Sequence, residues 1–229
     1  MIRIPDRMLV FAAHQDDETI GCGATIKKFS SLGCNVRVVF VTDGSTGIDQ
    51  SRSFENDIVQ TRKEESEKAL ATLGVNSVVN LGLPCQKVEN NINNFHKFIR
   101  EIRKFKPDII LTHSDIDKHR DHRAVSQIAA EASWKSSENI LPDLGASHSA
   151  KDIWAFEVLD PIKPDFVVDI DGFFPYKINA LKQYSSQYSI LNGESIFDYV
   201  DGISRVRGFA IGAKRGEGFR RISLSPVRI

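Results

Sequence analysis

Two clusters of histidine and acidic side chains are the residues of this sequence best suited to chemistry. The first is HQDDE at positions 14–18, and the second, about 100 positions later, is HSDIDKHRDH at 113–122. Imidazole nitrogens and carboxylate oxygens together form a ligand set that suits zinc and related divalent ions. Adjacent carboxylates also raise one another's pKa unless a positive charge lies nearby. Both clusters therefore point to a site for a divalent cation.

Each cluster also has a purely structural interpretation. Asp16, Asp17 and Glu18 precede a predicted helix, where acidic side chains cap free N–H groups and complement the helix dipole. The second cluster can be a polar loop in which an aspartate caps the next helix and the histidines are solvated. Its density of histidine and aspartate favours a functional site. Asp121 is placed there to accept the second N–H of a histidine, as carboxylates do around metal sites.

The elements expected around these clusters are alternating strands and helices. Apolar β-rich runs predict strands at 8–13, 35–41, 77–82, 108–112, 153–159, 166–170 and 219–224. Helical patterns and their end signals predict helices at 19–32, 57–73, 90–105, 121–134, 173–183 and 194–207. This alternation predicts an α/β fold, a Rossmann-like, doubly wound, mainly parallel sheet with helices on both faces. We expect a single domain over 1–229.

The predicted topology brings the two clusters together. In the common strand order 3-2-1-4 the first and fourth strands are neighbours, and ligands bind at the crevice beyond their carboxyl ends. One cluster follows each of these two strands, so both are expected to line the same cleft. A catalytic zinc site needs three protein ligands and an open position. A carboxylate that is not a ligand can then act as general base, and a histidine can stabilise an oxyanion.

Composition excludes several other classes of protein. Lys+Arg and Asp+Glu are 30 each, so the formal net charge is zero and we expect no nucleic-acid or membrane partner. No apolar segment reaches the ~18 residues of a membrane span, and the apolar run at 8–13 is too short for a signal peptide. Three cysteines without C-x-x-C spacing indicate reduced thiols in a cytoplasmic protein. A homo-oligomer is compatible with the sequence, which does not determine the oligomeric state.

The two clusters contain motifs similar to those of a known family. Ala13-His14-Gln15-Asp16-Asp17-Glu18 and His119-Arg120-Asp121-His122 resemble the signatures of the PIG-L/LmbE-like de-N-acetylases. The resemblance runs from about residue 8 to 222 and is strongest up to 125. Gln15 and Arg120 replace prolines that are common in the family, so the first loop lacks a fixed φ. The resemblance implies a Rossmann-like hydrolase that removes acetyl groups from N-acetylglucosamine-type sugars and their conjugates. The implied cofactor is Zn²⁺, with Fe²⁺ or another divalent ion as an alternative.

The resemblance also implies roles for individual residues. Three match the family's metal ligands: His14, Asp17 and His122. Three match its catalytic residues: Asp16 as general base toward a metal-activated water, His119 assisting the tetrahedral intermediate, and Asp121 in support. Three are expected on the substrate side: Arg62 in the second helix, Asp43 after the second strand, and Glu217 in Gly216-Glu217-Gly218-Phe219. The implied partner is a small N-acetyl amino sugar or glycoconjugate.

Other functions remain as alternatives. A dinucleotide-binding protein would use Gly21, Gly23 and Asp43, but Ile26 occupies the third glycine position and Gly21 lies eight residues past Ala13. A metal-dependent phosphoesterase would use the same histidines and aspartates in a two-metal site. A non-enzymatic binding module would require a degraded site, which the complete motifs oppose. We expect the loops 44–56 and 136–151 to set substrate choice, which the sequence leaves undetermined.

Overall fold

The fold is built on one mixed sheet, described by a computed structural model over residues 4–46, 58–188 and 195–222. Within these residues seven strands follow the order β3-β2-β1-β4-β5-β7-β6. Their bounds are β1 (Arg7–Ala12), β2 (Asn35–Thr42), β3 (Ser77–Leu83), β4 (Ile109–His113), β5 (Asp152–Phe156), β6 (Phe166–Asp169) and β7 (Gly216–Arg221). The first five strands run parallel, and β7 runs antiparallel to β5 and β6. The predicted order 3-2-1-4 is therefore confirmed.

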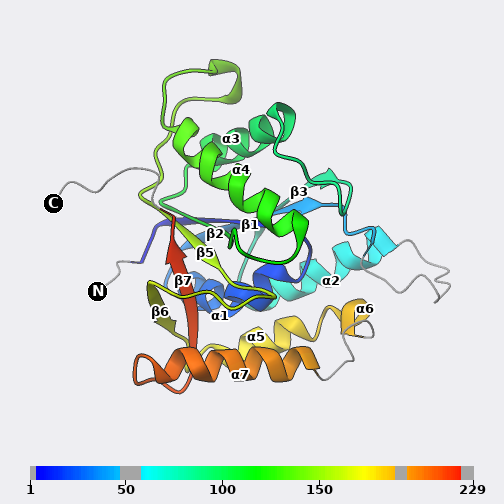
Figure 1. Ribbon diagram of the computed structural model, residues 1–229, viewed down its shortest axis with the longest axis vertical. Helices are drawn as coiled ribbons and strands as arrows, with labels where there is room; N and C mark the ends of the chain where they lie inside the picture. The colour runs from blue at the N-terminus through cyan, green and yellow to red at the C-terminus, as the bar shows by residue number, and fades with distance from the viewer. Residues whose placement is uncertain (1–3, 47–57, 189–194, 223–229) are drawn as a thin grey trace.

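Helices cover both faces of this sheet (Figure 1). They are α1 (Asp17–Ser31), α2 (Ile58–Leu73), α3 (Ile92–Phe105), α4 (Arg120–Ser136), α5 (Phe174–Leu181), α6 (Ser185–Tyr188) and α7 (Ser195–Phe209), with a 3₁₀ turn η1 (Pro142–Leu144). Alternate residues of β1 face opposite layers. Met8 and Val10 pack with the α1, α2 and α5 side, whereas Leu9 and Phe11 pack with α3 and α4. A strand buried on both faces must be apolar throughout, which explains the continuous run in β1.

Local sequence sets the ends of α3. The side chain of Asn91 accepts a hydrogen bond from the backbone N–H of Asn94 and so caps the first turn. Phe98 and Ile102, on the buried stripe of the helix, lie against the sheet with no exposed surface. The helix ends at Lys106, whose φ of 55° is left-handed. The following Pro107 disfavours a further helical turn.

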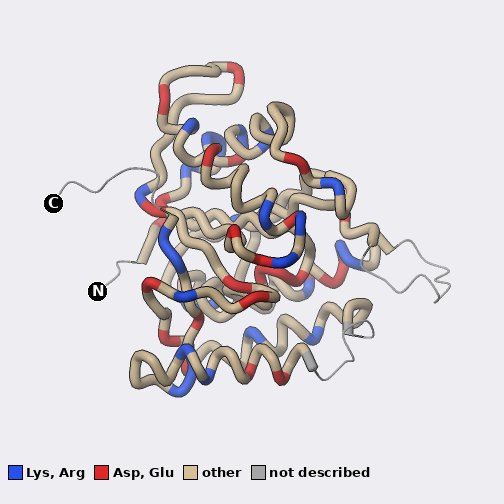
Figure 2. The backbone as a smooth tube through the Cα atoms, viewed as in Figure 1, with Lys and Arg blue, Asp and Glu red and all other residues tan. Residues whose placement is uncertain are grey.

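Every expected strand and helix is present among the described residues, with ends shifted by a few positions, whereas the short helix α6 was not predicted. The predicted positions 57, 194 and 223–224, and most of the loop 44–56, lie outside the described residues. The predicted loop 136–151 contains η1. No helix among the described residues is long and apolar enough to cross a membrane. Figure 2 shows basic and acidic residues interspersed along the chain rather than gathered in one layer.

Candidate metal and catalytic site

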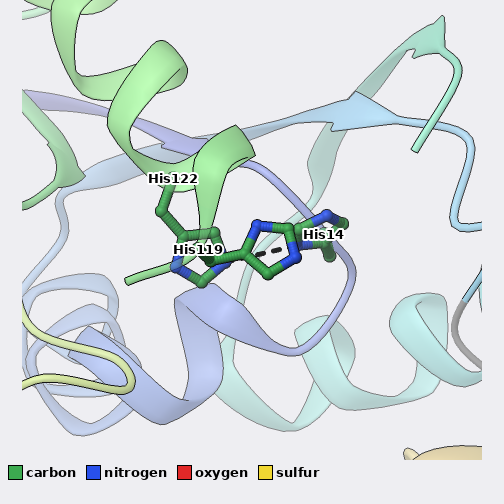
Figure 3. Close-up of side chains that lie close together, drawn as sticks. All are labelled: His14, His119 and His122. Atoms are coloured by element: carbon green, nitrogen blue, oxygen red, sulfur yellow. Dashed lines mark hydrogen bonds between the residues drawn. The ribbon is translucent and has the colours of Figure 1, made fainter. Parts of the chain in front are cut away.

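The two histidine and acidic clusters meet at the carboxyl edge of the sheet. β1 and β4 pair directly, so the loop after β1 and the start of α4 lie side by side. The imidazole of His14 faces those of His119 and His122 (Figure 3), with His14 Nδ1 lying 3.3 Å from His122 Nε2. The two clusters therefore meet, as the predicted strand order requires.

The three predicted ligands have converging donor atoms. His14 Nδ1 lies 3.2 Å from Asp17 Oδ2, and His122 Nε2 lies 3.3 Å from Asp17 Oδ1. A tetrahedral zinc ion with bonds of about 2.0–2.1 Å separates its ligand atoms by about 3.3 Å. All three side chains are buried, with residue exposures of 8% for His14, 3% for Asp17 and 2% for His122. The spacing and the donor types therefore fit a divalent ion of this size.

A second carboxylate lies behind each of the two histidines. His14 Nε2 is 3.1 Å from Asp121 Oδ2, and His122 Nδ1 is 3.1 Å from Asp117 Oδ1. Carboxylates in this position fix the tautomer of a metal-binding histidine and turn its other nitrogen toward the ion. This arrangement leaves His14 Nδ1 and His122 Nε2 directed at each other and at Asp17. It is a further observation in favour of a metal site.

Asp121 has a different partner from the one that the family resemblance implies. That resemblance puts it in support of His119, whereas its carboxylate contacts His14 and accepts the backbone N–H groups of Gln86 and Val88. Only the backbone N–H of Asp121 reaches His119, donating to Nδ1 at 3.2 Å. The more general expectation from the sequence, that Asp121 accepts the second N–H of a histidine, agrees with its place behind His14.

The electrostatics of the cluster favour a cation. Burial opposes a charge on His14, but Asp17 and Asp121 more than offset it and raise its pKa to about 10. Burial likewise opposes a charge on His122, whereas Asp17 and Asp117 raise its pKa to about 9. Burial would raise the pKa of Asp17, yet the surrounding imidazoles hold it well below its usual range. The buried carboxylates therefore demand positive charge, and a divalent ion meets that demand by displacing protons.

Two further histidines lie within reach of the same centre. Ligand atoms of His14, His119 and His122 lie within 4.8 Å of one another. Those of Asp17, His113 and His122 form a second group within the same distance. His113 Nε2 already accepts the backbone N–H of Ala13 at 2.9 Å. His119 Nδ1 accepts the N–H of Asp121, and its Nε2 faces the amide of Gln86 at 3.1 Å. His113 Nε2 also lies 3.4 Å from Asp17 Oδ2, and its Nδ1 has no hydrogen-bond partner among the described residues. The ligand set of His14, Asp17 and His122 therefore stays a prediction.

Asp16 stands beside the cluster in a strained backbone conformation. Its φ of 128° is rarely adopted by a residue with a side chain and costs about 1–3 kcal/mol. The fully buried carboxylate of Glu18 accepts the N–H of Asp16 at 3.1 Å and the hydroxyl of Tyr184 at 2.6 Å. Burial raises the pKa of Asp16 to about 7, although the guanidinium of Arg62 opposes the rise. A carboxylate with this pKa is suited to general-base catalysis near neutral pH.

Arg62 and Asp43 lie at the same edge of the sheet. Arg62 is 3% exposed and donates to the carbonyl of Gln15 at 2.5 Å, with its Nη2 lying 3.6 Å from Asp16 Oδ1. It also donates to the carbonyl of Gly44, whose φ is 77° and where a Cβ would approach the Gln15 amide to 2.5 Å. Asp43 is half-buried and accepts the N–H of Ser45 at 3.0 Å. Contacts of Arg62 and Asp43 with substrate stay predictions.

Glu217 is built into the support of α1. The helix is kinked at Cys22, whose φ is −145°, and Glu217 accepts the N–H groups of Ala24 and Thr25 at 3.0 and 2.7 Å. It also accepts a hydrogen bond from the buried ammonium of Lys177 at 2.6 Å. Both carboxylate oxygens are therefore occupied by the protein itself. The burial of Glu217 gives no support to the predicted role in substrate binding.

Sequence reasoning gave no role to three residues of this site. Asp117 and His113 lie in the second cluster, but their roles depend on which ring nitrogen each side chain faces. Gln86 lies on the loop after β3, outside both motifs.

Gly21 belongs to the dinucleotide-binding alternative. A Cβ there would come within 2.3 Å of the Phe156 ring, so this glycine permits close helix packing.

Comparisons with known proteins agree with the fold and with the motifs. Residues 9–133 match the family model described as PIG-L, GlcNAc-PI de-N-acetylase. The diacetylchitobiose deacetylase of Thermococcus kodakarensis is 28% identical over 219 residues, 93% of this chain and 82% of that protein. The N,N'-diacetylchitobiose deacetylase of Pyrococcus horikoshii, solved with its inhibitor MPG, gives a TM-score of 0.86 at 28% identity, over 97% and 87% of the two chains. A conserved protein of Thermus thermophilus gives 0.86 at 25% identity, over 98% and 97%.

Proposed function

Because the chain belongs to the PIG-L (GlcNAc-PI de-N-acetylase) family, we propose that it hydrolyses the acetamide of an N-acetylated amino sugar or glycoconjugate. Water adds to the acetyl carbonyl and the C–N bond breaks, so that acetate and a free amine leave. Similarity to diacetylchitobiose deacetylases over most of the chain supports this substrate class. The observation that carries the proposal is that His14 Nδ1, His122 Nε2 and the Asp17 carboxylate form a triangle of donor atoms separated by 3.2–3.3 Å. The neighbouring Asp16 is not part of this ligand triangle.

His14, Asp17 and His122 would hold a divalent ion, Zn²⁺ or alternatively Fe²⁺. Such an ion supplies a Lewis acid that polarises a carbonyl and lowers the pKa of water. Asp121 holds His14 in the tautomer that ligation needs, and the carboxylate of Asp117, 3.1 Å from Nδ1 of His122, favours the corresponding tautomer of that ring. Two neutral histidines and one aspartate anion carry a single negative charge. A divalent ion held by them would therefore keep part of its positive charge, which electrophilic catalysis requires.

Asp16 acts as the general base. Its carboxylate takes a proton from the attacking water, and its pKa of about 7 allows the same group to return that proton to the departing amine. The guanidinium of Arg62, 3.6 Å away, keeps the carboxylate oriented and opposes its protonation in the resting enzyme. The strained backbone at Asp16 is held by Glu18 and Tyr184, so the base does not depend on substrate for its position.

His119 stabilises the oxyanion that develops on the acetyl carbonyl. Its ring lies at the rim of the site, half-buried, with the centroid 4.7 Å from that of His14. The N–H of Asp121 occupies Nδ1, so Nε2 is the nitrogen that carries a proton to donate. A donor aimed at developing charge in a site with little water is worth about 10²–10³ in rate.

Acetate release tests the proposal directly. The purified protein, loaded with Zn²⁺, is incubated with N-acetylglucosamine, N,N'-diacetylchitobiose and an N-acetylglucosaminyl conjugate, each with and without a chelator. We expect acetate from at least one of these compounds and its loss when the metal is removed. A generic phosphomonoester serves as the comparison. Turnover of the phosphomonoester without acetate release would favour the metal-dependent phosphoesterase instead.

A further inference from the structure

Gln86 reaches into the site from the loop after β3. Its φ of 65° is left-handed, a conformation that residues with a Cβ seldom adopt. Its backbone N–H donates to Asp121 Oδ2 at 2.7 Å, the same oxygen that contacts His14 Nε2. The conformation of Gln86 is therefore held by the site itself. Its side chain is nevertheless exposed, so it can move without disturbing the core.

The side chain of Gln86 is in contact with His119. The structure places the nitrogen of its terminal amide, Nε2, 3.1 Å from His119 Nε2. His119 Nδ1 accepts the N–H of Asp121, and a neutral imidazole has a single acceptor nitrogen, so Nε2 must carry the proton. The amide atom facing it must then be an acceptor. The oxygen and nitrogen of a glutamine amide are assigned from such hydrogen bonds, so we exchange the two atoms of Gln86, which puts Oε1 on the Nε2–H of His119.

The group that occupies His119 in this way has the chemistry of the substrate. The side chain of glutamine ends in a carboxamide, and the bond that we propose to be hydrolysed is the carboxamide of an acetylated amine. Both present a carbonyl oxygen of similar hydrogen-bonding strength to the same Nε2–H. The difference is that the Gln86 amide is tethered to the protein, and its contact in the structure is with His119.

We propose that Gln86 is a placeholder for the substrate's acetyl carbonyl. In the free enzyme its Oε1 accepts the Nε2–H of His119 and holds the ring in the orientation that the reaction needs. When substrate binds, the acetyl carbonyl takes over this hydrogen bond and the exposed side chain moves out. This inference rests on the proposed deacetylase function. It assigns to Gln86 a direct competition with substrate, which raises KM.

Steady-state kinetics of acetate release separate this role from a structural one. Gln86→Met retains the length of the side chain without the amide. We expect kcat/KM to rise about 2- to 10-fold, mainly through a lower KM, because one competing neutral hydrogen bond is lost. Gln86→Glu supplies a stronger, charged acceptor, and KM is expected to rise. Lys87→Met, an exposed neighbour given the same replacement, is the matched control. An unchanged or higher KM in Gln86→Met would overturn the placeholder.

Two additions keep the test decisive. Gln86→Gly suits a left-handed backbone, so it replaces Gln86→Met if that variant does not fold, with the same expected fall in KM. The ¹⁵N chemical shift of His119 Nε2 in the zinc-loaded protein reports the hydrogen bond without any substrate, and we expect it to differ between wild type and Gln86→Met. An identical shift would contradict the contact. Absence of acetate release by the wild type would contradict the proposed function, whereas the ¹⁵N shift would still decide whether Gln86 holds His119.

Discussion

The Nε2 atom of His14 lies 3.1 Å from Oδ2 of Asp121, a residue 107 positions farther along the chain. This contact joins the loop after β1 to the first turn of α4 without any ion. It also determines which nitrogen of His14 is free, because Nε2 is occupied and only Nδ1 can face Asp17 and His122. The same carboxylate accepts two backbone N–H groups from the loop after β3. One side chain thus connects three strand ends around the centre.

Asp121→Asn tests this connection. The replacement preserves shape but offers an N–H₂ group or a weaker acceptor to His14, so the imidazole loses its fixed tautomer. We expect the affinity for Zn²⁺, measured by competition with a chromophoric chelator, to fall about 10- to 100-fold, the usual effect of losing such a carboxylate. Asp143→Asn, an exposed site on η1, is the control. Unaltered affinity in folded Asp121→Asn would show that His14 is oriented by other contacts.

Asp16→Ala tests the general base. Asp16 is adjacent to a proposed ligand, but its nearest charged partner is Arg62 and its contacts do not include the ligand triangle. We therefore expect kcat for acetate release to fall by about 10²–10⁴, the span for loss of a general base, while metal content per chain stays the same. Elemental analysis of the variant serves as the control. Turnover close to that of the wild type would remove Asp16 from this role.

Sequence patterns were sufficient to predict the sheet and the meeting of the two clusters. The strand order follows from alternating strands and helices with right-handed crossovers, and it requires the ends of β1 and β4 to be neighbours. His14, Asp17 and His122 could be proposed because each lies within a few residues of a strand end. These inferences need only the backbone, and backbone topology is what periodic apolar patterns encode.

Side-chain partners were beyond the reach of the same reasoning. The contact of Asp121 with His14 rather than with His119 depends on a rotamer at the start of α4. Glu217 accepts the backbone N–H groups of Ala24 and Thr25, which lie 193 and 192 positions before it in the chain. These two N–H groups are available because α1 is kinked at Cys22. Gln86 belongs to no motif. Its position follows from the packing of a loop for which local sequence carries no periodic pattern.

Glu217→Gln distinguishes the structural position of this residue from the predicted role in substrate binding. Side-chain exposure is 2% for Lys177 and 3% for Glu217, so the variant leaves a buried ammonium without its counter-charge. We expect the free energy of unfolding in urea to fall by about 3–5 kcal/mol, with part of it recovered in the double variant Lys177→Met/Glu217→Gln. A variant as stable as the wild type but with a raised KM would instead support a role in substrate binding.

Arg103→Met tests how the loop 136–151 is held. Arg103 is 2% exposed and its guanidinium donates to backbone carbonyls of six residues: Lys135, Ser136, Glu138, Ile140, Leu141 and Gly145. Removing the donors leaves the buried carbonyl of Ser136 and five part-buried carbonyls unpaired, and we expect a loss of about 2–5 kcal/mol in the free energy of unfolding. Arg100→Met, an exposed arginine on the same helix, should change stability by less than about 0.5 kcal/mol. Equal effects of the two substitutions would contradict this role of Arg103.

A crystal structure of the zinc-loaded protein, with the ion located by its anomalous scattering, tests the proposed metal site most directly. We predict one ion bonded at about 2.0–2.1 Å to His14 Nδ1, His122 Nε2 and an oxygen of Asp17, with Asp16 outside the bonding distance. An ion held through His113 or His119 in place of His14, or no ion between the loop after β1 and the start of α4, would contradict the account.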